Sequence, residues 1–234
     1  MFLAKRLSAQ YKVIAVARRI DKLRSEFKDF PNVRPYFLDL NDVNRIGGAL
    51  EEIIRVEGDI FYVINNAGVM QPGSIEALKM EQMLQSIHVN GLAPMMVLKT
   101  LLPAMKKQNF GRIINITSGA PLNCSPEYGA YSASKSILNS LTITLGKELV
   151  SSNIKVNLMS PGPVQSEMAP NATLQPSICF PTVDYLLSLP EDGPTGQFFW
   201  LGYEVPLFPD LEGVDWLGGV GNEKLRKIQD IKDD

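Results

Sequence analysis

The sequence predicts an α/β fold in which a mostly parallel sheet is covered by helices on both faces. Short apolar segments rich in β-branched residues alternate with amphipathic segments along most of the 234 residues, a pattern typical of βαβ units. Several of these apolar segments lack polar alternation, which indicates strands buried on both sides, as in parallel sheets. We therefore expect a doubly wound parallel sheet of three layers in a single domain over residues 1–234.

The predicted elements follow the apolar periodicity from the first residue onward. Strands are expected at 13–17, 35–40, 60–64, 112–117, 154–159 and 197–201. Helices are expected around 1–10, 21–30, 43–56, 74–85, 92–107, 134–150 and 182–189. Within the helix over 92–107, Pro94 and Pro103 should start, bend or end turns, because proline lacks an N–H donor.

Composition excludes several classes of protein. The chain is 45% hydrophobic and 21% charged, which is ordinary for a globular protein. A net charge of −2 gives no reason to expect nucleic acid or an anionic membrane as a partner. Cys124 and Cys179 supply neither a disulfide framework nor a paired metal-ligand spacing. With no long apolar run and no signal-peptide core, the sequence predicts a cytoplasmic protein.

Ligands of parallel α/β sheets bind at the carboxyl ends of the strands. Arg18, Asp39, Asn66, Ser118 and Val164 each lie at or after the end of a predicted strand. We therefore expect these residues to share one edge of the sheet and to mark the functional site.

Tyr131 and Lys135 are four residues apart, so on a helix they lie on one face, one turn apart. A phenol has a reference pKa of about 10, and a neighbouring ammonium lowers it by stabilising the phenolate. The pair is therefore a candidate acid/base, with the Ser118 hydroxyl as a partner. The alternative for an isolated pair of this kind is a plain surface contact.

Three features together resemble the short-chain dehydrogenase/reductase family over residues 1 to about 205. They are Asn65-Asn66-Ala67-Gly68 at a strand end, Ser118 thirteen residues before Tyr131, and the Tyr-x-x-x-Lys spacing to Lys135. The resemblance implies a Rossmann-like fold and an NAD(P)-dependent oxidoreductase without a metal. Hydride would move between nicotinamide and a carbonyl or secondary alcohol.

The resemblance also implies roles for the catalytic residues. Tyr131 would be the general acid/base, Lys135 would lower its pKa and bind the nicotinamide ribose, and Ser118 would hold the substrate carbonyl. Asn90 would kink a helix and anchor a water of the proton relay. The alternatives are a turn-forming hydroxyl for Ser118 and a local turn or cap for Asn90. His88 is interpreted as structural.

A cofactor site is implied as well. Asn66, Ala67 and Gly68 would line the adenosine side, and Asp39 would reach the adenine amino group; a helix N-cap is the alternative for Asp39. Val164 would offer its backbone to the nicotinamide carboxamide. The full predicted set is Arg18, Asp39, Leu40, Asn66, Ala67, Gly68, Tyr131, Lys135, Pro161, Gly162, Val164 and Ser166, the last where the family often has Thr.

Cofactor choice is predicted from the end of the strand over 13–17. NAD-preferring members of the family usually carry an Asp there, whereas this chain has Ala17 followed by Arg18 and Arg19. An arginine suits a 2′-phosphate, so NADP is the expected cofactor, with NAD as the alternative. Both arginines could instead be solvated loop charges.

The glycine-rich turn Thr-Gly-x-x-x-Gly-x-Gly that opens the family does not occur in this sequence. The strand that would precede it is central in the family, between the strands over 13–17 and 60–64. Its absence should split the sheet and expose two strand edges. Either the coding start lies upstream, or the chain is a truncated form with impaired cofactor binding. The rival function is accordingly a non-catalytic relic or binding protein of the same fold.

The substrate-covering segment is expected at residues 165–194. Its apolar residues favour an apolar pocket but are equally consistent with core packing; they are Met168, Leu174, Ile178, Phe180 and Tyr185. In the tail over 206–234, Trp216 and Leu217 could cover a neighbouring subunit or pack back.

A homodimer or homotetramer is expected from the helix over 134–150. It carries more apolar residues than one sheet-facing stripe requires, namely Ile137, Leu138, Leu141, Ile143, Leu145 and Leu149. A second apolar face is most simply covered by another subunit.

Overall fold

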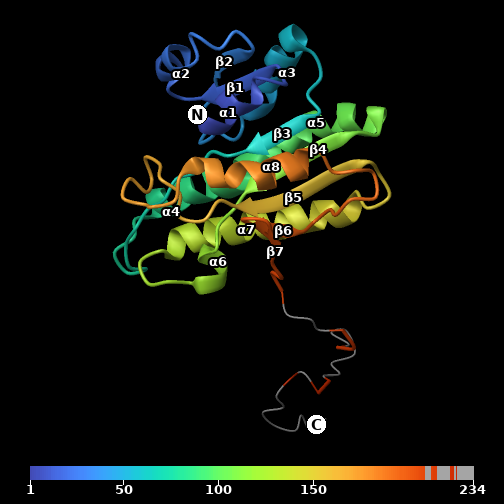
Figure 1. The fold of residues 1–234 in the computed structure, drawn as a ribbon. Coiled ribbons are helices and arrows are strands. Elements are labelled where there is room, and N and C mark those ends of the chain that lie inside the picture. The colour runs from blue at the N-terminus through green and yellow to red at the C-terminus, as the bar shows by residue number, and fades with distance from the viewer. Residues whose placement is uncertain (209–211, 215–221, 224, 226–234) are drawn as a thin grey trace.

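The computed structural model describes residues 1–208, 212–214, 222–223 and 225. In that part of the chain the strands form two sheets (Figure 1). One pairs β1 with β2 in parallel, and the other has the order β3-β4-β5-β6-β7, parallel except for β7. The strands are β1 (Val13–Ala17), β2 (Val33–Phe37), β3 (Tyr62–Asn65), β4 (Gly111–Ile116), β5 (Ile154–Ser160), β6 (Phe198–Trp200) and β7 (Tyr203–Glu204).

Helices cover both faces of the sheets, as predicted. One face is covered by α3 (Ile46–Glu57), α5 (Ala93–Gln108) and α7 (Gly129–Glu148). The other is covered by α1 (Phe2–Leu7), α2 (Ile20–Glu26) and α8 (Phe180–Leu187). The remaining helical segments are α4 (Met80–Ile87), a π-helical turn over His88–Leu92, α6 (Ala120–Asn123) and a 3-10 turn over Pro176–Cys179.

The two sheets lie between the same helical layers, as their packing shows. On the face of α3 and α5, Ile14 and Val16 of β1 pack in the apolar cluster that contains Ile113 of β4. On the opposite face, Val13 packs in the cluster that contains Ile114. Within the described residues no strand pairs with both β1 and β3, so the predicted division of the sheet is confirmed. The carboxyl ends of the parallel strands of both sheets therefore lie at the same edge of the molecule.

Several predicted element boundaries are wrong. The helix expected at 74–85 begins only at Met80, because the chain after Ser74 forms a turn in which Ala77 and Leu78 donate to its carbonyl. The second strand lies at 33–37 rather than 35–40, with Pro35 paired to Ala15; proline is tolerated because β2 is an edge strand. β7 and α6 were not predicted.

α7 begins at Gly129, five residues before its predicted start. The prediction counted six apolar residues on this helix, more than one sheet-facing stripe requires. Leu138 and Leu149 are buried, Ile143 and Leu145 are partly buried against the core, and Ile137 is partly buried. Leu141 is 37% exposed. Packing within the chain therefore covers part of this apolar surface, and the second apolar face stays a prediction.

Among the described residues no helix is long and apolar enough to cross a bilayer. Trp216 and Leu217 lie outside the described residues.

Candidate active site

The three residues of the predicted acid/base group meet at the carboxyl end of β4. Ser118 lies two residues after β4, and Tyr131 and Lys135 lie on the first turns of α7. The Ser118 hydroxyl lies close enough to the Tyr131 phenol to lower its pKa. The Lys135 Nζ lies 6.0 Å from the centre of the Tyr131 ring. Residues from two separate elements thus form one site.

Lys135 is a buried cation, with 3% of its surface exposed. Its Nζ donates to the Ile116 carbonyl oxygen at 2.7 Å, which anchors α7 to the end of β4. Burial penalises the charged form and lowers the pKa of Lys135 from 10.5 to about 8. An ammonium has three donor hydrogens, so donors remain for a ligand beside the single hydrogen bond that Lys135 makes to the described chain.

The pKa of Tyr131 is raised above 10.0, because burial disfavours the phenolate more than the hydrogen bond with Ser118 favours it. The predicted lowering of this pKa by Lys135 is therefore wrong for this arrangement. The Lys135 ammonium donates one hydrogen bond to the Ile116 carbonyl oxygen and lies beside the Tyr131 ring. Tyr131 accordingly holds its proton at neutral pH.

Replacing Lys135 should change the pH dependence of stability. The folded pKa of about 8 lies below the unfolded 10.5, so a buried charge destabilises the fold in full below pH 8. That penalty disappears as the folded protein loses the proton between pH 8 and 10.5. The stability of the wild type relative to Lys135→Met should therefore rise by roughly 3 kcal/mol from pH 7 to pH 10.5. Denaturant unfolding of both proteins at several pH values measures this difference, and a pH-independent difference would contradict it.

Asn90 is buried in the π-helical turn between α4 and α5. Its side chain donates to the Val69 carbonyl at 2.8 Å and to the Ser134 hydroxyl at 2.9 Å, and it accepts from the Val69 N–H at 2.8 Å. π-helical turns of this kind are frequent at functional sites. A π-helical turn interrupts the helix at Asn90, and the amide joins the turn after β3 to α7. Because both amide hydrogens are used, the side chain positions neighbouring groups.

The turn after β3 approaches the catalytic residues closely. A Cβ at Gly68 would lie 3.4 Å from the Asn90 Oδ1 and 3.7 Å from the Lys135 Nζ. The backbone therefore comes within reach of Lys135 because residue 68 has no side chain. Asn66 and Ala67 are exposed, whereas Asn65 is held by a 2.7 Å hydrogen bond from its amide nitrogen to the Asn115 oxygen.

Arg18 and Asp39 lie beyond β1 and β2, and the Arg18 Nε is 3.9 Å from the Asp39 Oδ1. Asp39 also accepts from the Asn41 N–H at 3.0 Å, forming a local turn. The alternative of a helix N-cap is wrong, because α3 begins only at Ile46. Leu40 packs against the core cluster under α3. A cation and a carboxylate thus stand at the end of the smaller sheet.

The chain after β5 forms a closed loop over residues 161–174, which begins with Pro161. Gly162 adopts a φ of 68° that favours glycine, and Val164 forms a parallel bridge with Leu174. At the tip, Ser166 and Ala169 exchange two backbone hydrogen bonds of 3.2 Å. Ser166 therefore shapes the turn that carries the two residues between them.

Sequence reasoning missed the charges at this tip. Arg19 donates to the Glu167 carboxylate at 2.6 Å, and Lys22 donates to its other oxygen. No local pattern could have indicated these contacts, since the partners are separated by 148 and 145 residues. Sequence reasoning also missed Ser134, which orients Asn90, although it lies within the motif.

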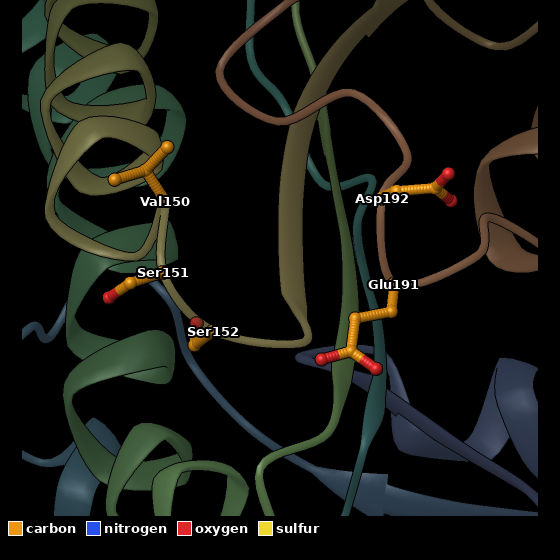
Figure 2. Close-up of a pocket in the computed structure, with 5 residues that line it drawn as sticks. All are labelled: Val150, Ser151, Ser152, Glu191 and Asp192. Atoms are coloured by element: carbon orange, nitrogen blue, oxygen red, sulfur yellow. The ribbon is translucent and has the colours of Figure 1, made fainter.

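Other features lie away from this site. The surface pocket in Figure 2 is lined by residues 150–152, Glu191 and Asp192, whose carboxylates point in different directions. Residues 150–152 precede β5, and Glu191 and Asp192 precede β6, at the opposite end of the sheet from Ser118. In the substrate-covering segment, Tyr185 is 49% exposed and Phe180 packs against the core. Among the described residues no cluster of His, Cys, Asp and Glu side chains is suited to a metal ion.

The chain resembles known sequences along most of its length. The family model described as short chain dehydrogenase matches residues 2–176. A "Dehydrogenase/reductase SDR family protein 7-like" of Anopheles gambiae is 32% identical over 170 residues, 69% of this chain and 54% of that protein. A benzil reductase, (S)-benzoin forming, of Bacillus cereus is 31% identical over 191 residues, 77% of each chain. The chain spans about half the length of the first of these relatives.

Solved structures share the fold. A metagenomic short-chain oxidoreductase in complex with NADP is 26% identical, with a TM-score of 0.74, and the match covers 85% of this chain and 89% of that one. A 4-hydroxyisoleucine dehydrogenase complexed with NADH and succinate is 25% identical, with a TM-score of 0.76, and the match covers 84% and 90%.

Proposed function

The chain belongs to the short-chain dehydrogenase family, and we propose that it is an oxidoreductase that interconverts a carbonyl and a secondary alcohol with a nicotinamide dinucleotide, NADP preferred. The observation that carries the proposal is the Tyr131 phenol, which lies near the Ser118 hydroxyl and beside the buried cation Lys135. Relatives named for ketone chemistry, among them an acetoacetyl-CoA reductase of Acinetobacter that is 34% identical, support it.

The residues present fit part of a nicotinamide dinucleotide, since the glycine-rich turn that holds the pyrophosphate in the family does not occur in this sequence. Lys135 has donors to spare for ribose hydroxyls, and Gly68 leaves the backbone open beside it. The Arg18 side chain is 54% exposed after β1, so its guanidinium is available to a phosphate group. The loop containing Pro161, Gly162, Val164 and Ser166 would face the nicotinamide end. When bound, the cofactor would supply or accept the hydride.

The chain's own groups then handle the oxygen of the substrate. Ser118 holds the carbonyl oxygen, and Tyr131 donates its proton to that oxygen as the alcohol forms. The raised pKa of Tyr131 keeps the phenol protonated at neutral pH, which suits the general-acid role. Asn90 holds the Gly68–Val69 turn against α7 and so positions the residues around Lys135.

The direct test is turnover of a ketone panel that includes benzil, because one relative is a benzil reductase. The protein is mixed with NADPH or NADH, and oxidation of the cofactor is followed by absorbance. Consumption of the reduced cofactor that depends on the ketone is expected. Cofactor binding without turnover of any ketone would favour the binding-protein alternative instead.

Arg18→Ala should weaken NADPH binding much more than NADH binding. NADPH alone carries the 2′-phosphate, and a charge-assisted contact is worth about 1.5–3 kcal/mol, or roughly tenfold to a hundredfold. Calorimetric titration of both cofactors measures the ratio, with the exposed Arg24→Ala of α2 as the matched control. Equal losses for both cofactors would refute the assignment.

Assembly into a homodimer or homotetramer stays a prediction. Its support on α7 is the exposed apolar side chain of Leu141.

A further inference from the structure

The loop closed by Val164 and Leu174 has a defined base and a defined tip. At the base, the Gln165 N–H donates to the Leu174 carbonyl at 2.8 Å beside the parallel bridge. At the tip, the Ser166 hydroxyl accepts the Ala169 N–H at 3.2 Å. The two residues between, Glu167 and Met168, are presented side by side by this turn.

Glu167 reaches the amino-terminal part of the chain. One carboxylate oxygen accepts from Arg19 at 2.6 Å, and the other accepts from Lys22. The hydrogen bonds from Lys22 and Arg19 lower the pKa of Glu167 to about 2, and the larger contribution comes from Lys22. The carboxylate therefore stays ionised at every working pH, so protonation cannot release it.

Met168 points toward the catalytic residues. Its Cε would lie 3.9 Å from a Cβ at Gly68, and the same Cβ would lie 3.7 Å from the Lys135 Nζ. The loop tip thus spans the carboxyl ends of both sheets, from Arg19 after β1 to Gly68 after β3.

We infer that this loop tip is a latch over the dinucleotide site, in which Glu167 occupies an anion site formed by Arg19 and Lys22 that a phosphate group of the cofactor must take over. The inference rests on the proposed function. Two cations from one turn of chain, converging on the two oxygens of one carboxylate, also match a phosphate group. On cofactor binding, a phosphate group would replace the Glu167 carboxylate between Arg19 and Lys22. The loop would then be released, and Met168 would move away from the turn at Gly68.

The latch should respond to salt and to ligands. The side chains of Arg19, Lys22 and Glu167 are 67%, 40% and 62% exposed, so ions in solution screen them. Exposed pairs of this kind are individually weak. Glu167→Gln, which keeps the shape and removes the charge, should therefore tighten cofactor binding by about threefold to tenfold.

The experiment measures two properties of wild type, Glu167→Gln and Glu148→Gln. Glu148 is an exposed glutamate at the end of α7, so its variant matches the change in net charge. Calorimetry gives the affinity for NADPH and for NADH, and hydrogen exchange reports the mobility of the loop over 164–174. Faster loop exchange and tighter binding are expected in Glu167→Gln alone, and rising salt should accelerate loop exchange in the wild type.

The two cofactors identify the competing phosphate. Tighter binding of NADPH alone would assign the site to the 2′-phosphate, whereas equal gains for NADH would assign it to the pyrophosphate. Unchanged affinities, or loop exchange identical in wild type and Glu167→Gln, would overturn the latch and leave the proposed function standing. If neither the wild type nor any variant binds NADPH or NADH, both the proposed function and the competition between Glu167 and a cofactor phosphate are overturned. The hydrogen-exchange data would still decide whether Glu167 restrains the loop over 164–174.

Discussion

Tyr131→Phe should lower the turnover of any ketone substrate by about 10²–10⁴-fold, because the variant lacks the proton that general-acid catalysis delivers. The ring of the variant still fills the space beside Lys135. The fold should therefore persist, with a thermal unfolding midpoint close to that of the wild type. Steady-state kinetics with the best substrate of the panel measures the loss.

The control is Tyr128→Phe, three residues earlier and 37% exposed at the start of α7. It removes the same hydroxyl from the same helix end and should retain wild-type turnover. Near-normal activity of Tyr131→Phe, or equal losses in both variants, would sink the assignment of Tyr131 as the proton donor.

Gly146→Ala should destabilise the fold by about 1–3 kcal/mol, although alanine ordinarily favours a helix. A Cβ at position 146 would lie 2.6 Å from the Gly196 Cα and 2.7 Å from its nitrogen. These backbone atoms are fixed by β5, because the Gly196 N–H donates to the Val156 carbonyl at 2.7 Å. The segment around Gly196 therefore cannot move away from α7 without breaking its hydrogen bonds to β5. Urea unfolding measures the loss.

Gly48→Ala, within α3, is the matched control. A Cβ there meets nothing within 4 Å, so the helix should gain about 0.5–1 kcal/mol from the reduced flexibility of the unfolded chain. Opposite signs for the two substitutions are expected. A stabilised Gly146→Ala would show that α7 and the β5–β6 connection separate more easily than the packing indicates.

The fold class was predictable because its signal is local. The strand over 13–17 matches β1 residue for residue, since an uninterrupted apolar run of this length predicts a buried strand without reference to the rest of the chain. The start of α4 was not predictable with the same accuracy. There, Ser74 and the turn that follows compete with helix formation, and short polar segments of this kind permit both outcomes.

The candidate site divides in the same way. By itself the sequence determined that Tyr131 and Lys135 share a helix face and that Ser118 ends a strand, because these are spacings along one chain. The tertiary structure alone decided that the Lys135 ammonium binds Ile116 and that burial raises the Tyr131 pKa. It alone also brought Glu167 to Arg19, across 148 residues of chain. Protonation depends on desolvation and on partners distant in sequence, and both arise only when separate elements pack together.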